Sequence, residues 1–351
     1  MRVVVVGATG NVGTSVVRAL AADSDVNEVI GAARRVPEFS EPGVSWRAAD
    51  ITHSDLAELF SGADAVVHLA WAIQPSRDAD ALRATNVLGS ERVLDGVSKA
   101  GVPRLVYASS VGAYSPGPKD RAVDEAWPTD GIETSFYSRH KAEVESLLDE
   151  FETGQPGVRV VRLRPGLIFK REAATEIRRL FLGPFVPRIA FHRRALFAIP
   201  DVERLRFQAV HSDDVAEAYR LAVTHEEAQG AYNVAAEPVL DPDALAEALD
   251  ARKIAVSSRV LRGLAAATWR ARLQPTPEGW LDMALGVPIM SSAKIRNELG
   301  WEPRRDAQET LLELLAGLRD GAGHRTPPLD PASSGPLRIQ ELKTGIGARA
   351  Y

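Results

Sequence analysis

The sequence contains no cysteine, and this absence excludes several kinds of chemistry. Without cysteine the 351-residue chain has no disulfide, no thiolate nucleophile and no thiolate-ligated metal site. Lysine is also scarce, with 7 residues against 35 arginines, so a lysine inside a motif is informative. The net charge of −5 shows no surplus of basic residues, which argues against nucleic acid as the main partner.

The chain also lacks a long apolar run. The opening stretch, MRVVVVGATG, breaks at a glycine after a few apolar residues, whereas a signal peptide has a longer apolar region. No stretch approaches the roughly 18 apolar residues of a membrane span. The remaining composition, 45% hydrophobic and 25% charged, is that of an ordinary globular protein. We therefore expect a cytoplasmic protein without a membrane span.

Short β-branched segments alternate with helical patterns through the first half of the chain. The strand-like segments are 3–6, 29–33, 44–48, 65–69, 105–109 and 158–163. The helical segments between them are 12–22, 56–60, 85–100 and 137–152. Because runs buried on both faces alternate with helices, the pattern predicts an α/β fold with a doubly wound parallel sheet.

After residue 164 the pattern loosens, and this suggests a second part. We expect residues 1–165 to form a nucleotide-binding domain, to which a segment at about 205–236 returns. Residues 166–204 and 237–318 are assigned to a smaller, mostly helical substrate-binding part. Residues 319–351 are rich in Gly, Pro and Ser and are predicted to be a flexible tail.

A glycine pattern follows the first strand and opens the first helix. It reads Gly7-x-x-Gly10-x-x-Gly13. Gly7 permits a tight turn, Gly10 allows the backbone to approach a pyrophosphate, and Gly13 allows close packing of helix on sheet. The free N–H groups and the positive dipole end of the helix then attract the anion. The pattern predicts a dinucleotide-binding loop.

A second group of residues has the composition of a proton-transfer site. Tyr137 and Lys141 are four residues apart, so they share one face of the predicted helix. Ser110 ends the strand that precedes this helix. A tyrosine hydroxyl titrates near pKa ~10, and a neighbouring ammonium and an oxidised nicotinamide both favour the phenolate, so we expect them to lower the pKa of Tyr137 toward the working range.

Together these motifs resemble the extended branch of the short-chain dehydrogenase/reductase superfamily, the NAD-dependent epimerase/dehydratase family. The resemblance is carried by "GATGNVG", "YASS", "YSRHK", "VHSDD" and "SSAKIRNELGWEP", in the family's order over roughly residues 2–318. It implies a Rossmann fold and hydride transfer to or from a nicotinamide. In this family the second strand-end serine, the tyrosine and the lysine are catalytic, which maps to Ser110, Tyr137 and Lys141.

The resemblance also implies a set of cofactor contacts and no metal. Asp50 matches the residue that binds the adenine amino group, Asn86 is mainly structural, and the backbone at Pro165 and Gly166 approaches the nicotinamide carboxamide. The full implied set is Gly7, Thr9, Gly10, Asn11, Val12, Gly13, Arg34, Arg35, Asp50, Ile51, Leu69, Ala70, Trp71, Asn86, Tyr137, Lys141, Pro165, Gly166 and Ile168.

The end of the second predicted strand bears on the choice between NAD and NADP. An acidic residue there binds both ribose hydroxyls, whereas arginine pairs with a 2′-phosphate. This sequence has Ala33 near the expected acid, followed by Arg34 and Arg35. Since two guanidinium groups can clamp a phosphate, NADP is favoured over NAD.

Three departures from the family's pattern concern the substrate. Leu167 stands where sugar-nucleotide epimerases have an asparagine that contacts the diphosphate, and Lys170 stands at a family glycine. Ser110-Val111-Gly112 lacks the Asp-Glu pair of the dehydratases. The stretch 171–206 is rich in arginine and phenylalanine, so it could bind an anion, cover an apolar substrate or form a solvated face over a packed underside.

The sequence therefore predicts an NAD(P)-dependent oxidoreductase or epimerase with a small-molecule substrate. A nucleotide-sugar epimerase that works by transient oxidation is one alternative. A regulator that senses NAD(P) without turnover is another, although such a protein has no need of Tyr137. The family's common homodimer makes a dimer a further expectation.

Overall fold

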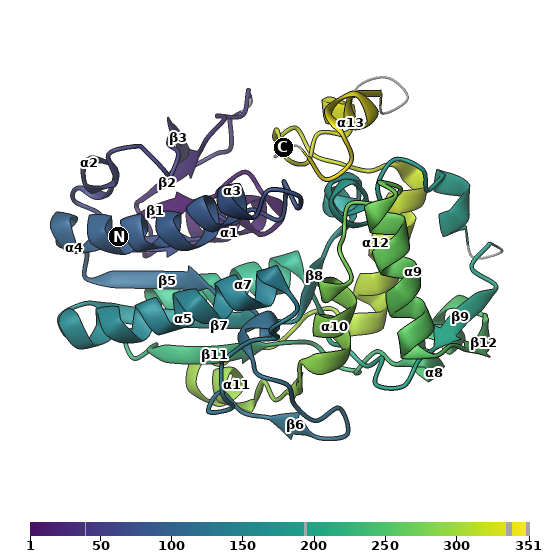
Figure 1. The fold of residues 1–351 in the computed structure, drawn as a ribbon. Helices are drawn as coiled ribbons and strands as arrows, with labels where there is room; N and C mark the ends of the chain where they lie inside the picture. The colour runs from purple at the N-terminus through teal and green to yellow at the C-terminus, as the bar shows by residue number, and fades with distance from the viewer. Residues whose placement is uncertain (39, 193–194, 335–338, 349–351) are drawn as a thin grey trace.

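The computed structural model describes residues 1–38, 40–192, 195–334 and 339–348, and its centre is a seven-stranded parallel sheet (Figure 1). The strand order is β11-β7-β5-β4-β1-β2-β3, with every pair parallel. The strand order therefore changes direction between β1 and β4, and doubly wound sheets bind their ligands beyond the carboxyl ends of the strands at such a point. The strands are β1 (Arg2–Val6), β2 (Glu28–Ala33), β3 (Val44–Ala48), β4 (Ala65–His68), β5 (Arg104–Ala108), β7 (Arg159–Pro165) and β11 (Gly230–Val234).

Helices cover both faces of the sheet, as the predicted Rossmann-type fold requires. Val3 and Val5 of β1 face one layer, whereas Val4 and Val6 face the other. The first layer contains α1 (Asn11–Ala21), α7 (Ser212–Thr224) and α11 (Ala293–Leu299). The second contains α2 (Leu56–Phe60), α4 (Gly89–Ala100) and α5 (Phe136–Gly154). The α/β fold class is confirmed.

One predicted helix differs from its observed form. The segment 85–100 is the end of a longer helical run made of α3 (Ala79–Arg83), a π-helical turn η1 (Ala84–Leu88) and α4. The π turn contains Asn86, whose side chain binds a loop rather than facing solvent. Periodicity does not reveal such a turn, because it changes the hydrogen-bond spacing and not the apolar pattern.

The remaining elements lie beyond the carboxyl ends of β5 and β7 and are smaller. Three two-stranded sheets pair β8 (Leu167–Phe169) with β10 (Ala209–His211), β9 (Ala198–Asp201) with β12 (Arg252–Ala255), and β6 (Ala122–Val123) with β13 (Ile289–Met290). The helices are α6 (Ala174–Ile177), α8 (Pro242–Leu249), α9 (Ser258–Arg270), α10 (Gly279–Gly286) and α12 (Ala307–Asp320). Short helical turns are η2 (Val111–Ala113), η3 (Arg171–Ala173), η4 (Arg178–Leu182), η5 (Arg188–Phe191) and η6 (Pro331–Ser334).

The described part of 319–351 is folded, which corrects the prediction of a flexible tail. The helix α13 (Ile339–Thr344) lies at the top of Figure 1, between the Rossmann sheet and α12. Glu341 is 3% exposed and forms a buried ion pair with Arg178 at 2.7 Å. Arg77, in the loop after β4, donates to the carbonyl of Ile346. Composition suggested mobility, but a few specific contacts order this segment, and residues 335–338 and 349–351 lie outside the description.

Within the described ranges, none of the helices has the length and apolar character to cross a membrane.

Candidate active site

The loop between β1 and α1 has the shape that a dinucleotide diphosphate needs. Gly7 has φ +87°, and a Cβ there would lie 2.7 Å from the backbone nitrogen of Ala70. A Cβ on Gly13 would lie 2.3 Å from the carbonyl oxygen of Gly7, whereas one on Gly10 would meet only that oxygen, at 3.7 Å. The side of the loop at Gly10 is therefore open for a ligand, while the other two glycines allow tight packing.

The first turn of α1 is suited to an anion. Its N-cap, Gly10, has no capping side chain, and its first turn contains no acidic residue. The N–H groups of that turn and the helix dipole therefore remain available to a negative charge. Among the other predicted loop residues, Thr9 is buried and Val12 packs on the core of the sheet. Asn11 donates to the carbonyl of Ile168 at 3.1 Å and accepts from Ser212, so its side chain fixes the loop.

The predicted adenosine end lies at the ends of β2 and β3. Arg34 and Arg35 follow β2 and are exposed. Burial raises the pKa of the Asp50 carboxyl, but hydrogen bonds from Thr52 and the charge of Arg34 outweigh it and leave the pKa below its ordinary value. Ile51 is a core residue, 4% exposed.

The end of β4 leads into a loop that Asn86 holds in place. The Asn86 amide donates to the carbonyl of Ala72 at 2.8 Å and accepts from its N–H at 2.7 Å. Leu69, Ala70 and Trp71 come directly before that point, beside the glycine loop. Asn86 therefore fixes the backbone of this loop at Ala72.

His68 ends β4 and is a packed residue. Its Nε2 lies 3.0 Å from the Ser90 hydroxyl, and burial lowers the pKa of the imidazole to about 3, so it stays neutral. The described residues contain no group of three or more metal-ligating side chains.

The three candidate catalytic side chains meet at the carboxyl end of β5. Ser110 follows β5, and its hydroxyl accepts from the N–H of Gly112 at 3.0 Å. Tyr137 is in the first turn of α5 and packs on Gly112, where a Cβ would lie 2.9 Å from the tyrosine ring. The Lys141 ammonium donates to the carbonyl of Ala108 at 2.6 Å and lies 3.5 Å above the Trp71 ring.

The pKa of Tyr137 is set mainly by burial. Burial raises it above its ordinary value, and a hydrogen bond with Ser110 only partly opposes that rise. The Lys141 ammonium is directed to the Ala108 carbonyl and lies 5.8 Å from the centre of the tyrosine ring. Burial also places the pKa of Lys141 well below its ordinary value, despite the opposing charge of Glu145.

Pro165, Gly166 and Ile168 lie at the end of β7 and the start of β8. A Cβ on Gly166 would lie 2.6 Å from the carbonyl oxygen of Gln208, so this glycine allows close packing inside the protein. Ile168 reaches the glycine loop through its carbonyl, which accepts from Asn11. The segment 165–168 therefore lies beside the glycine loop. The close packing that Gly166 allows is against Gln208 of the protein.

Sequence reasoning missed Glu145, whose contacts fix α5 against the sheet. Glu145 is 1% exposed and accepts from Ser109 at 2.5 Å and from Arg164 at 2.8 and 2.9 Å. Arg162 adds a third contact at 3.0 Å. These donors and ion pairs outweigh desolvation and hold the pKa of Glu145 at about 2. Its spacing of four from 137 and 141 places it on the same helix face, but that spacing does not identify its arginine partners.

Lys170 was noted only as a departure from the family, and the structure gives it a position. Its buried ammonium donates to the carbonyl of Asn11 at 2.7 Å and to Thr14 Oγ1 at 2.6 Å. Burial lowers its pKa to about 8. Lys170 therefore braces the first turn of α1 from beneath the glycine loop.

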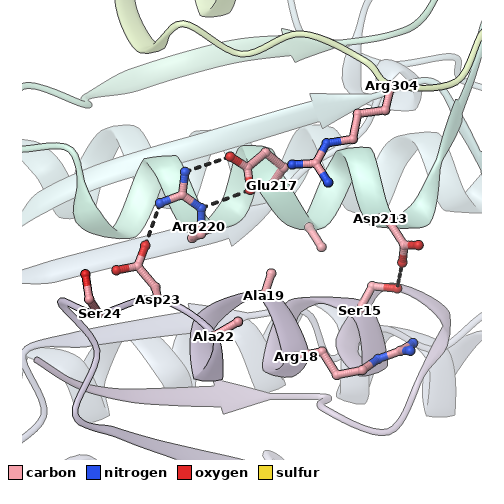
Figure 2. A pocket seen from close by; sticks show the side chains of 11 residues that line it. Ser15, Arg18, Ala19, Ala22, Asp23, Ser24, Asp213, Glu217, Arg220 and Arg304 are labelled. Carbon is pink, nitrogen blue, oxygen red and sulfur yellow. Dashed lines mark hydrogen bonds and ion pairs between the residues drawn. The ribbon is translucent and has the colours of Figure 1, made fainter.

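A separate groove runs between α1 and α7, and Figure 2 shows its lining. Arg220 bridges Asp23 and Glu217 there, and Ser15 donates to Asp213 at 2.7 Å. The groove contains none of the predicted site residues, and its charged groups largely satisfy one another. We regard it as a solvated surface.

A family model matches residues 3–235, and its description is the NAD-dependent epimerase/dehydratase family. The chain belongs to this family.

Several curated proteins share part of the sequence with this chain. A sterol-4-alpha-carboxylate 3-dehydrogenase from Saccharomyces cerevisiae is 29% identical over 187 residues, which is 52% of this chain and 51% of that protein. A 3 beta-hydroxysteroid dehydrogenase/Delta 5-->4-isomerase from Mycobacterium tuberculosis is 30% identical over 190 residues, with 51% and 50% covered. The chain spans about half the length of these relatives.

Solved structures show the same fold over most of the chain. The UDP-glucose 4-epimerase of Thermus thermophilus, solved with NAD, has a TM-score of 0.65 at 22% identity and covers 91% of this chain and 99% of its own. The dTDP-glucose 4,6-dehydratase of Streptomyces venezuelae, also solved with NAD, has a TM-score of 0.66 at 20% identity, covering 91% and 97%. At this identity the likeness shows the fold alone.

The buried ion pairs of Glu145 predict that its replacement destabilises the fold. Replacing Glu145 with Gln leaves Arg164 buried without its anion, whereas Arg162 keeps Asp149 and Glu152, so we expect the free energy of unfolding to fall by about 3–5 kcal/mol. Denaturant titration at pH 7 measures this change. Glu150→Gln, on the exposed side of the same helix, is the matched control and is expected to unfold like the wild type.

The loss of stability caused by Glu145→Gln is expected to depend on pH. The pKa of Glu145 is lowered on folding, so its contribution is complete above its unfolded value of 4.5 and is lost as pH falls toward about 2. The difference between the wild type and Glu145→Gln is therefore expected to shrink below pH 4.5. A difference that stays constant across this range would mean that Glu145 is not the anchoring anion.

Proposed function

We propose that this protein catalyses NAD(P)-dependent hydride transfer between a nicotinamide and a carbonyl or alcohol, with Tyr137 as the acid–base group. The observation that carries the proposal is the convergence of Ser110, Tyr137 and Lys141 at the end of β5. The glycine loop opens at the end of β1, on the same edge of the sheet. A bound nicotinamide would supply or accept the hydride at the substrate carbon.

Each of the three side chains has a distinct role in this proposal. The Ser110 hydroxyl donates to the substrate oxygen and fixes its direction. Tyr137 exchanges a proton with that same oxygen. Lys141 supplies a positive charge and ammonium donors beside Tyr137, in reach of the ribose of the cofactor. Its present partner, the Ala108 carbonyl, is a neutral acceptor that a ribose hydroxyl can replace.

The raised pKa of Tyr137 favours carbonyl reduction over alcohol oxidation at neutral pH. A phenol that keeps its proton is ready to donate it, whereas oxidation and the first step of epimerisation require the phenolate. The dehydrogenase names of the curated relatives support a net redox reaction. Epimerisation of a nucleotide sugar remains the second candidate, because the fold is shared with a UDP-glucose 4-epimerase. A protein that only senses NAD(P), without turnover, would have no need of an acid–base group at Tyr137.

We further propose that NADP is preferred over NAD. Arg34 and Arg35 follow β2, where the adenosine ribose of a bound cofactor would lie, and Arg34 acts electrostatically on Asp50. The name of a matched relative, an L-arabinose 1-dehydrogenase (NAD(P)(+)) from Haloferax volcanii, admits both cofactors. We also propose that the substrate is a small molecule, that the protein forms a homodimer and that it is cytoplasmic.

The role of Tyr137 is tested by its replacement with Phe. We expect turnover to fall by about 10²–10⁴-fold because proton transfer is lost, while NADP⁺ still binds. The assay follows cofactor absorbance with a ketone panel and a UDP-glucose control. In the wild type, reduction is expected to be level near neutral pH and to decline in alkali, whereas oxidation rises with pH. Turnover that survives Tyr137→Phe would exclude the mechanism.

Cofactor preference is tested with Arg34→Ala. This change removes a charge-assisted pair with the 2′-phosphate that is worth about 1.5–3 kcal/mol. We therefore expect NADP⁺ binding to weaken by about tenfold or more, whereas NAD⁺ binding stays unchanged. Calorimetric titration of both cofactors measures the two dissociation constants. Arg47→Ala, an exposed arginine on β3, is the matched control. Equal weakening for both cofactors, or tighter NAD⁺ binding in the wild type, would reject the preference.

A further inference from the structure

Aromatic side chains surround the candidate proton donor. The ring of Trp280 lies 4.9 Å from that of Tyr137, and the ring of Trp71 lies 5.8 Å from it on an edge-to-face approach. Phe181 and Phe136 pack on Trp280 at 5.0 and 6.0 Å. We call these four residues, Trp71, Phe136, Phe181 and Trp280, the aromatic wall.

The backbone and apolar side chains fix the position of this wall. Gly279, at the start of α10, lies so close to α5 that a Cβ would come within 2.2 Å of the carbonyl oxygen of Thr134. Met283 of α10 packs with Ile132 and Val287 in a buried cluster that Tyr137 and Trp280 also contact. Trp280 is therefore a fixed part of the site, and both Tyr137 and Trp280 remain partly exposed.

The wall carries no charge. Its polar atoms are the indole N–H groups of Trp71 and Trp280, each buried and without an acceptor among the described residues. No charged group contributes to the raised pKa of Tyr137, which is set by burial and by Ser110. The charge that borders the site is the Lys141 ammonium, which the proposed function assigns to the cofactor ribose.

The arginines of 171–206 do not compensate for this lack of charge around Tyr137. Arg178 pairs with Glu341 and Arg171 pairs with Asp320. The guanidinium groups of three others bind elsewhere: Arg179 to Ser333 and the Pro328 carbonyl, Arg204 to the carbonyls of Leu285 and Gly117, and Arg206 to Asp241. The guanidinium of Arg188 lies against Gly321. Arg193 and Arg194 lie outside the described residues. The described pairs hold the C-terminal segment and the loops in place, so they are not free for a substrate diphosphate.

We infer that the substrate is an uncharged, largely apolar ring ketone or the corresponding alcohol, which packs on Trp280 and presents its oxygen to Ser110 and Tyr137. The inference rests on the proposed function and adds the substrate class to it. In the reductive direction the carbonyl oxygen would take the Tyr137 proton, and a bound reduced nicotinamide would supply the hydride that bonds to the carbonyl carbon. The phenolate would then be reprotonated from solvent, so one ketone, one reduced cofactor and one proton would give one alcohol and one oxidised cofactor.

The test compares two probes on NADP⁺-saturated protein, 2-tetralone as the apolar ring ketone and UDP-glucose as the nucleotide sugar. Calorimetry is expected to show binding of 2-tetralone and at least tenfold weaker binding of UDP-glucose. Trp280→Ala is expected to weaken 2-tetralone binding by about three- to tenfold, the value of a lost aromatic contact, and Trp280→Phe to restore most of it. Binding of NADP⁺ should not change in either variant.

Trp127→Ala is the matched control, because Trp127 packs near Arg121 and donates to the Ser115 carbonyl away from the wall. Tighter binding of UDP-glucose, no binding of 2-tetralone, or an effect of Trp127→Ala equal to that of Trp280→Ala would overturn the substrate class.

Failure of the proposed function gives a different result. If 2-tetralone binds through Trp280 but is never reduced, the hydride-transfer mechanism fails while the substrate class stands. If UDP-glucose is oxidised in a Tyr137-dependent manner, the substrate class fails while the hydride-transfer mechanism stands.

Discussion

The buried carboxylate of Glu145 is the constraint on which the candidate site depends. It joins three elements, because it belongs to α5 and accepts from Ser109 at the end of β5 and from Arg162 and Arg164 of β7. A carboxylate buried this deeply is stable only when donors and positive charges surround it. Here they do, and α5 is consequently fixed in height and rotation against the strand ends.

The orientation of the catalytic side chains follows from that anchor. Tyr137, Lys141 and Glu145 are spaced by four along α5, so fixing the third directs the other two to the same edge of the sheet. Ser109 is held by the same carboxylate, and its neighbour Ser110 is placed beside Tyr137. The aromatic wall closes over this group, and burial there raises the pKa of Tyr137. One buried anion thus links the stability of the fold to the proposed proton transfer.

The sequence predicted the parts of the molecule that depend on local pattern. Valine runs such as Val3 to Val6 and the glycines at 7, 10 and 13 each have a strong periodic or steric signature, so the sheet, its helices and the loop were predictable. The role of Glu145 was not, because it depends on arginines that lie 17 and 19 residues away in the sequence. The folded C-terminal segment was wrongly predicted for the same reason, since the contact of Glu341 with Arg178 spans 163 residues. The pKa of Tyr137 likewise depends on tertiary burial, which spacing alone does not give.

The most direct test of the account is to follow the transferred hydride itself. The reduced cofactor is deuterated at both hydrogen positions of nicotinamide C4 and incubated with the protein and a ring ketone, and the alcohol is analysed by mass spectrometry. The account predicts deuterium on the carbinol carbon of the product. An alcohol that forms without deuterium, or a cofactor that binds tightly and is never oxidised by any carbonyl substrate, would contradict it.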